Sequence, residues 1–286
     1  MGSLETPPVA TFAVSRQLAL EWTGLSLAGF VVSLFALGGL YAGVTGKTVG
    51  GIVIESGNTG SVVTTLVVGL VLIIGVIVVH ELIHGVAMSH YGGNPRYGTG
   101  VAYFVLPYAY ATADTEFTRN QFIVIALAPL VIITAVGVPI MLIFDLPLLL
   151  LALAINIAGA VGDLWMVSVL SRFPADVDVV DTMTGLAVYG SVEAPPLQGI
   201  GGVLRRTLIG FGVTIGVFLI VSMLAPIFLS LAGVTEFSLG PPETIWSIFQ
   251  WESSPEGFSS SLGGGIVGVS GLVGLAYGVL GTRRAR

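Results

Sequence analysis

Two of the chain's three histidines stand in a pattern that binds divalent metals. The apolar stretch around them reads Val-Ile-Val-Val-His80-Glu81-Leu-Ile-His84, so the two histidines lie four residues apart and enclose a glutamate. On a helix, residues four apart lie on the same face, one turn from each other. Two imidazoles can therefore bind one Zn²⁺ ion, and Glu81 can act as general base on a metal-bound water. The pattern predicts a catalytic zinc centre with His80 and His84 as ligands.

A catalytic zinc site needs a third protein ligand, and two residues compete for that role. Asp163 lies in its own apolar span at a depth that matches the depth of His80 and His84 in theirs. His90 reproduces the spacing of the third histidine in the soluble metzincins. A continuing helix, however, places His90 about 15 Å along the axis from His80. We favour Asp163 and keep His90 as the alternative metal ligand.

Two other residues of these apolar spans stand out. Asn156 lies two turns before Asp163, on roughly the same face of the expected helix. It is either a support for the substrate or the oxyanion, or one half of an interhelical hydrogen bond. Pro129 predicts a kink in its own helix, because proline lacks a backbone N–H. We assign Pro129 no chemistry.

The composition indicates a membrane protein. Of the 286 residues, 54% are hydrophobic and 9% are charged, whereas roughly 25% are charged in soluble domains. The chain has no cysteine, so a metal has to be bound by His, Asp or Glu. The formal net charge of −6 argues against a nucleic-acid partner.

Long apolar runs predict an all-α membrane protein with a bundle of about six transmembrane helices. The expected spans cover residues 22–44, 62–90, 122–144, 146–170, 208–232 and 262–280. A short β-hairpin or re-entrant segment is expected between the second and third spans, where residues 101–110 are rich in β-forming side chains. We expect one membrane-embedded domain over residues 1–286, with its core at 62–185 and an external acidic loop at 234–261.

The basic residues predict the orientation of the chain in the membrane. With six spans, all nine arginines fall on one side and Lys47 falls on the other. Cytoplasmic loops carry an excess of Lys and Arg. We therefore expect a multi-pass protein of the cell membrane with both termini in the cytoplasm.

Taken together, several motifs resemble the zincin peptidases of prokaryotic membranes, a family similar to the site-2 proteases. The motifs are His80-Glu-Leu-Ile-His84-Gly85, Gly92-Gly93, Arg119-Asn-Gln-Phe-Ile, Leu127-Ala-Pro129 and Asn156-x-x-Gly159-x-x-Gly162-Asp163-Leu164. The resemblance implies that His80, His84 and Asp163 bind zinc and that Glu81 is the general base. It also implies that the β-like stretch at 101–110 pairs with an unfolded substrate segment. Gly162-Asp163-Leu164 departs from the Asn-Pro-Asp-Gly or Leu-Asp-Gly motif of site-2 proteases.

The sequence favours a zinc metalloendopeptidase that carries out intramembrane or membrane-associated proteolysis. Its expected cofactor is Zn²⁺, and its expected substrate is a membrane protein or a membrane-proximal peptide, cleaved near the cytoplasmic face. Two other functions use the same residues. A non-catalytic membrane protein could bind zinc for structure or sensing, and an ion or metal transporter could use the polar residues as a pathway.

Overall fold

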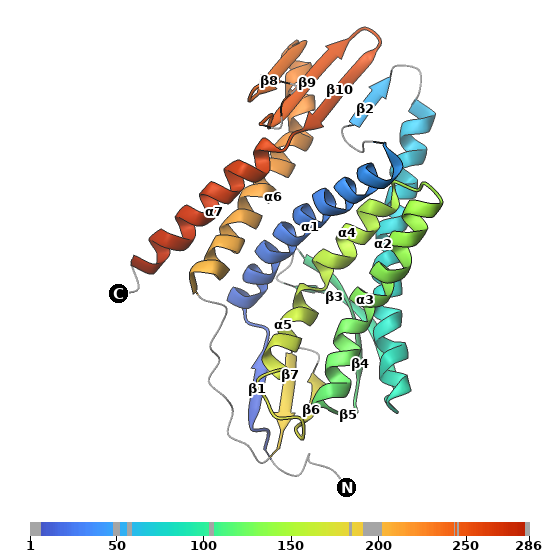
Figure 1. Ribbon diagram of the computed structural model, residues 1–286, viewed down its shortest axis with the longest axis vertical. Helices are drawn as coiled ribbons and strands as arrows, with labels where there is room; N and C mark the ends of the chain where they lie inside the picture. Colours follow the sequence, from blue (N-terminus) through green and yellow to red (C-terminus); the bar gives the residue numbers. More distant parts are fainter. Residues whose placement is uncertain are drawn as a thin grey trace. The chain divides into compact units, whose positions relative to one another are not determined.

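The computed structural model describes residues 7–47, 52–55, 59–102, 106–182, 185–190, 202–242, 244 and 246–283. Within these residues most of the chain is helical, with small sheets between the helices (Figure 1). The helices are α1 (Arg16–Thr45), α2 (Thr59–His90), α3 (Arg119–Ile143), α4 (Leu149–Gly159), α5 (Val161–Leu170), α6 (Gly202–Leu231) and α7 (Gly265–Arg283). The strands are β1 (Ala10–Ala13), β2 (Ile52–Glu55), β3 (Pro95–Ala102), β4 (Leu106–Ala113), β5 (Glu116–Thr118), β6 (Asp178–Thr182), β7 (Gly185–Tyr189), β8 (Glu236–Leu239), β9 (Phe249–Ser254) and β10 (Gly257–Leu262).

The chain divides into two compact units, each assembled from segments that are distant in sequence. The first unit contains Met1–Trp22 and Leu72–Gln198, and the second contains Thr23–Val71 and Gly199–Arg286. The helices α1 and α2 each contribute residues to both units. The residues expected to carry the chemistry, from His80 to Asp163, all belong to the first unit.

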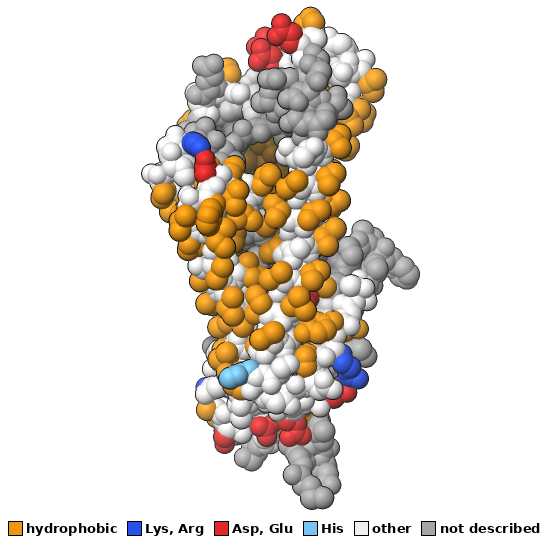
Figure 2. Space-filling model, turned by 90° about the vertical axis from the view of Figure 1, so that its right-hand side faces the viewer, with side chains coloured by type: hydrophobic (Ala, Val, Ile, Leu, Met, Phe, Trp, Pro, Cys, Tyr) orange, Lys and Arg blue, Asp and Glu red, His pale blue; other side chains and the backbone are white. Residues whose placement is uncertain are grey.

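Among the residues that the structure describes, five helical segments are long and apolar enough to cross a membrane. They are Arg16–Thr45, Val63–His90, Arg119–Ile143, Leu149–Leu170 and Gly202–Leu231. Figure 2 faces the side of α2 and α3, and apolar side chains cover most of the helical surface there. On α2 the exposed side chains include Leu66, Leu70, Val71, Ile74, Val78 and Leu82. Such a large exposed apolar surface suggests a membrane protein.

The sixth expected span differs from the other five. Its residues form an apolar helix, but the stretch Gly265–Gly281 within α7 is shorter than the five membrane-length helices. A helix needs about 20 residues to cross a bilayer. The expected count of six spans therefore stays a prediction. The fourth expected span is interrupted, because α4 ends at Gly159 and α5 begins at Val161.

The expectation of an all-α protein is incomplete, because segments between the helices pair as antiparallel strands. In the first unit, four strands are ordered β1-β7-β6-β5, and β3 pairs with β4 between α2 and α3. Residues 103–105, inside the expected hairpin or re-entrant segment, lie outside the described residues. The strands β6 and β7 have only five residues each. Runs this short carry too little period-two pattern to be recognised from sequence.

The expected external acidic loop at 234–261 includes strands of the second unit, and its external position stays a prediction. The strands β8, β9 and β10 join the distant β2 in a four-stranded sheet of order β2-β10-β9-β8. The reason is the alternation Phe249-Gln-Trp251-Glu in β9: the two aromatic side chains are buried, and Glu252 is exposed. The indole N–H of Trp251 donates a hydrogen bond of 2.9 Å to the Val234 carbonyl.

One apolar cluster joins the ends of α2, α3 and α5 to the strands of the first unit. Its buried members are Met88, Ala113, Phe117, Phe122, Ile125, Val169, Leu170, Phe173, Val177, Val179, Leu186 and Val188. We call this set the end cluster. Interlocked side chains in such a core allow little displacement, so the end cluster fixes the three helix ends relative to one another.

The start of α3 is fixed by local sequence. Thr118 and Gln121 form a capping box, in which the Thr118 hydroxyl accepts from the Gln121 N–H and the Gln121 side chain accepts from the Thr118 N–H. The Arg119 guanidinium donates to the Phe173 carbonyl, and the Arg119 N–H donates to the Val177 carbonyl at 3.0 Å. These bonds join the first turn of α3 to the segment that leads into β6.

Loss of the capping box should lower stability measurably. The Thr118→Ala variant leaves the Gln121 N–H without its acceptor, and we expect the free energy of unfolding to fall by about 1 kcal/mol. Thr118→Ser keeps the hydroxyl and should stay within a few tenths of a kcal/mol of the parent. Unfolding of the purified protein in detergent, followed by circular dichroism, measures both. Equal stability of the alanine and serine variants would show that the cap is unimportant.

Candidate metal centre

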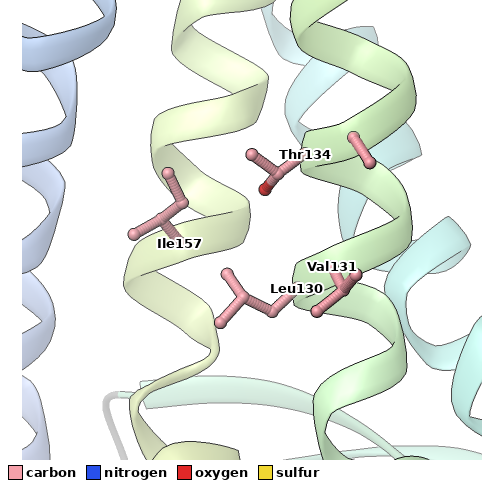
Figure 3. Close-up of a pocket in the computed structure, with 5 residues that line it drawn as sticks. Leu130, Val131, Thr134 and Ile157 are labelled. Carbon is pink, nitrogen blue, oxygen red and sulfur yellow. The ribbon is translucent and has the colours of Figure 1, made fainter.

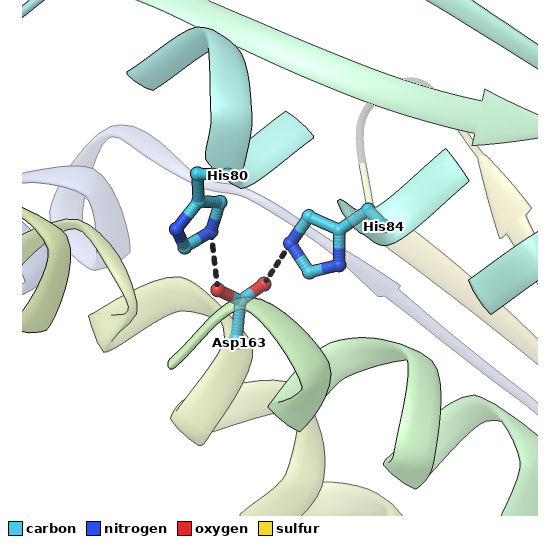
Figure 4. A group of neighbouring side chains, drawn as sticks. All are labelled: His80, His84 and Asp163. Carbon is cyan, nitrogen blue, oxygen red and sulfur yellow. Dashed lines mark hydrogen bonds and ion pairs between the residues drawn. The ribbon is translucent and has the colours of Figure 1, made fainter. Parts of the chain in front are cut away.

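His80 and His84 lie one turn apart on the buried face of α2. Each is only 8% exposed, although neighbouring side chains of the helix such as Val79 and Leu82 are 45% and 46% exposed. The two rings lie 4.9 Å apart between centroids, with their planes inclined at 74°. The four-residue spacing places both imidazoles on the same side of the helix, and both face α5 (Figure 4).

Asp163 reaches the two imidazoles from α5. The chain leaves helical geometry at Ala160, and α5 starts one residue later, so Asp163 lies in its first turn. The carboxylate is also 8% exposed. One of its oxygens, Oδ2, lies 3.3 Å from Nε2 of His80, and the other, Oδ1, lies 3.4 Å from Nε2 of His84 (Figure 4).

The second nitrogen of each imidazole is already engaged. Nδ1 of His80 donates to Oδ1 of Asn156 at 2.9 Å, and Nδ1 of His84 donates to the backbone carbonyl of Ile125 at 2.9 Å. These bonds place a proton on Nδ1 in both histidines, so Nε2, the nitrogen that faces Asp163, is the one that can serve as a metal ligand. Hydrogen bonds of this kind orient the histidine ligands of metal sites.

The donor set suits zinc. One ligand atom from each of His80, His84 and Asp163 can be chosen so that all lie within 4.8 Å of one another. Zinc bonds of about 2.0–2.1 Å in a tetrahedral site separate the ligand atoms by roughly 3.3 Å. The distance from each Nε2 to its own Asp163 oxygen is similar, at 3.3 Å for His80 and 3.4 Å for His84. Two imidazoles and one carboxylate form the three-ligand set of catalytic zinc sites, in which a fourth position stays open.

Glu81 lies beside this group. Its carboxylate accepts a hydrogen bond from the backbone N–H of Ala111 in β4, and it is close enough to interact with the charges of His80, His84 and Asp163. It is half-buried. The hydrogen bond holds the carboxylate against β4, next to the three possible ligands.

The other predicted site residues take different positions. Asn156 is 3% exposed and bonds to His80, and its Nδ2 has no hydrogen-bond partner among the described residues. His90 is exposed at the end of α2, in edge contact with Tyr91 at 5.1 Å between ring centroids. It does not belong to the group of possible ligands. Sequence reasoning missed the Ile125 carbonyl and the Ala111 N–H, because backbone groups have no side-chain signature.

An apolar cavity of about 470 Å³ that is widely open to the surface lies between α3 and α4, and none of its lining residues belongs to the ligand group (Figure 3). Its lining residues are Leu130, Val131, Thr134, Ala135 and Ile157. The Thr134 hydroxyl is buried without a partner among the described residues. An almost wholly hydrocarbon lining suits apolar groups, and it offers no metal ligand.

Asp181 of β6 is an additional acidic residue near the site. Its carboxylate accepts a hydrogen bond from the Thr112 hydroxyl and interacts with the charges of His84 and Glu81. Burial raises the pKa of Asp181 to about 6, and the negative charge of Glu81 raises it as well. The Thr112 bond and His84 act in the opposite direction but do not offset the burial.

A buried cluster of two histidines and one aspartate in an apolar helical protein defines a candidate metal centre of the hydrolase type. Residues 73–177 match a family model described as "Putative zincin peptidase". The matched region includes α3 and reaches from before His80 to beyond Asp163. No curated protein and no solved structure gives a significant match. The family match and the possible metal site together support a metalloprotease-like role.

The raised pKa of Asp181 predicts a pH dependence of stability in the metal-free protein. The folded pKa of about 6 lies above the ordinary value of 3.8. The folded state therefore binds more protons in this range, and stability should fall as the pH rises from about 4 to 6. Asp181→Asn removes the ionisable group. The unfolding temperature of this variant should therefore decrease less than that of the parent as the pH rises through this range.

The exposed Asp176, just before β6, provides the control. Asp176→Asn should keep the pH profile of the parent, because the substitution leaves the buried carboxylate in place. Identical profiles of unfolding temperature for the parent and Asp181→Asn between about pH 4 and 7 would contradict the prediction.

Proposed function

We propose that the chain is a zinc metalloendopeptidase that cleaves membrane proteins or membrane-proximal peptides near the cytoplasmic face. The observation that carries the proposal is the convergence of His80, His84 and Asp163 from two separate helices. Ionisable side chains within membrane helices are costly and usually functional. The family match over residues 73–177 supports the same function.

His80 and His84 would hold the metal through Nε2, and Asp163 through a carboxylate oxygen. When bound, Zn²⁺ supplies a Lewis acid that polarises the scissile carbonyl and lowers the pKa of a water molecule. Asn156 and the Ile125 carbonyl hold the two imidazoles in the required tautomer by accepting from Nδ1. The protein thus keeps both rings aimed at one point before the substrate arrives.

Glu81 is the proposed general base. Its carboxylate takes a proton from the attacking water and later delivers that proton to the leaving amine nitrogen. The Ala111 N–H orients the carboxylate for this transfer. Asn156 retains a buried donor, Nδ2, without a partner among the described residues. That donor is available to the carbonyl oxygen of a bound substrate, where negative charge develops during attack.

The cytoplasmic placement rests on the arginines. Arg96 and Arg119 follow the end of α2 that carries the histidines, and Arg172 follows the end of α5 that carries Asp163. An excess of basic residues marks the cytoplasmic side of a membrane protein. The proposed centre is therefore nearest to that side, within reach of cytoplasmic water.

Replacement of the general base should separate binding from catalysis. Glu81→Gln keeps the size of the side chain and loses the base, so we expect unchanged zinc content and at least about a 100-fold loss of peptide-bond cleavage. Cleavage of a membrane-protein substrate reconstituted with the purified enzyme measures the activity, and elemental analysis measures the zinc. A Glu81→Gln variant as active as the parent would overturn the assigned role.

Removal of a ligand should abolish zinc binding. His80→Ala and Asp163→Ala should each lose the stoichiometric zinc, whereas His90→Ala, an exposed change in the same helix, should retain it. Metal analysis after purification with equal detergent and buffer measures all three. Retained zinc without cleavage of any membrane substrate would favour a structural zinc protein. Metal flux into sealed vesicles that requires His80 and Asp163 would favour a transporter.

A further inference from the structure

The buried proline of α3 leaves one backbone carbonyl without its helical donor. In an α-helix the N–H of each residue donates to the carbonyl four positions earlier. Pro129 lies inside α3 and has no N–H, so the carbonyl of Ile125 receives no such bond. The pyrrolidine ring also crowds that carbonyl and turns it away from the helix axis. A buried carbonyl without a donor costs free energy, so another donor is needed.

His84 supplies that donor. Its Nδ1 lies 2.9 Å from the Ile125 oxygen. All three groups are buried, because Ile125 and Pro129 are almost completely inaccessible and His84 is 8% exposed. The same bond meets the need of each partner: the freed carbonyl gains a donor, and the imidazole gains an acceptor that fixes its tautomer.

We propose that Pro129 is a positioning residue of the metal centre. Because Pro129 has no N–H to donate, the Ile125 carbonyl remains available to accept from Nδ1 of His84. This bond orients the imidazole so that its Nε2 faces Asp163. This inference rests on the proposed function, because it assigns a role in zinc binding. The two histidines are then held by different means: His80 by the side chain of Asn156, and His84 by a backbone group that a proline has released.

Pro139 provides a matched control in the same helix. It also interrupts the hydrogen bonding of α3, but it is exposed and lies ten residues further along the helix. The carbonyl that it releases belongs to Ala135, a residue of the apolar cavity and not of the ligand group. A change at Pro139 therefore tests the general effect of a proline in this helix.

The test is the zinc affinity of full-length protein carrying Pro129→Ala. Alanine restores an N–H that competes with His84 for the Ile125 carbonyl. We expect a 10- to 100-fold weaker zinc affinity, as for other partners of histidine ligands, measured by competition with a chelator. We also expect a shifted visible absorption spectrum after cobalt substitution, because the orientation of one imidazole changes. Pro139→Ala should leave both readouts at the parent values.

A backbone ester separates the missing donor from the proline ring. Replacement of Pro129 by lactic acid, the α-hydroxy analogue of alanine, introduces the same methyl group but no N–H, so zinc affinity should stay near the parent value. Equal affinity and equal cobalt spectra for Pro129→Ala and the parent overturn the inference alone. Equal losses in the alanine and ester variants also overturn it, because the ring would then be the cause. A parent protein that binds no zinc overturns the proposed function and this inference together.

Discussion

Two imidazoles and a carboxylate buried among apolar helices have to satisfy one another, because the hydrocarbon side chains around them offer no hydrogen-bond partners. Each nitrogen of His80 and His84 has a neighbour: Nδ1 faces Asn156 or the Ile125 carbonyl, and Nε2 faces Asp163. An uncompensated polar group in such apolar surroundings costs several kcal/mol. The arrangement of α2, α3, α4 and α5 around these atoms follows from that requirement.

The helix α3 has the largest part in holding this arrangement. Its capping box and Arg119 fix its start against the segment before β6, and Ile125 contributes a side chain to the end cluster and a carbonyl to His84. A single residue thus connects the apolar core with the ligand group. The geometry of the centre therefore depends on the packing of α3 as much as on the ligands themselves.

Local sequence was sufficient for part of the site and insufficient for the rest. His80 and His84 could be placed together because helical periodicity alone determines their spacing, and Asp163 could be matched to them by counting residues to the ends of the spans. The four-stranded sheet of the first unit could not be predicted, since β6 and β7 are short and depend on pairing with distant β1 and β5. The partner of His84 could not be predicted either, because it is a carbonyl released by Pro129, a residue that a sequence reading treats only as a kink.

The interruption at Ala160 divides the span into two helices, α4 and α5, that are held in place by different contacts. The preceding helix, α4, is largely buried, and its contact with the ligand group is the hydrogen bond between Asn156 and His80. Asp163 belongs to α5 instead, whose last residues Val169 and Leu170 are part of the end cluster, as is Met88, one turn beyond His84. Asp163 and His84 are thus anchored close to one packed protein core, whereas α4 reaches the ligand group through the bond between Asn156 and His80, so a displacement of α4 acts first on the His80 ring.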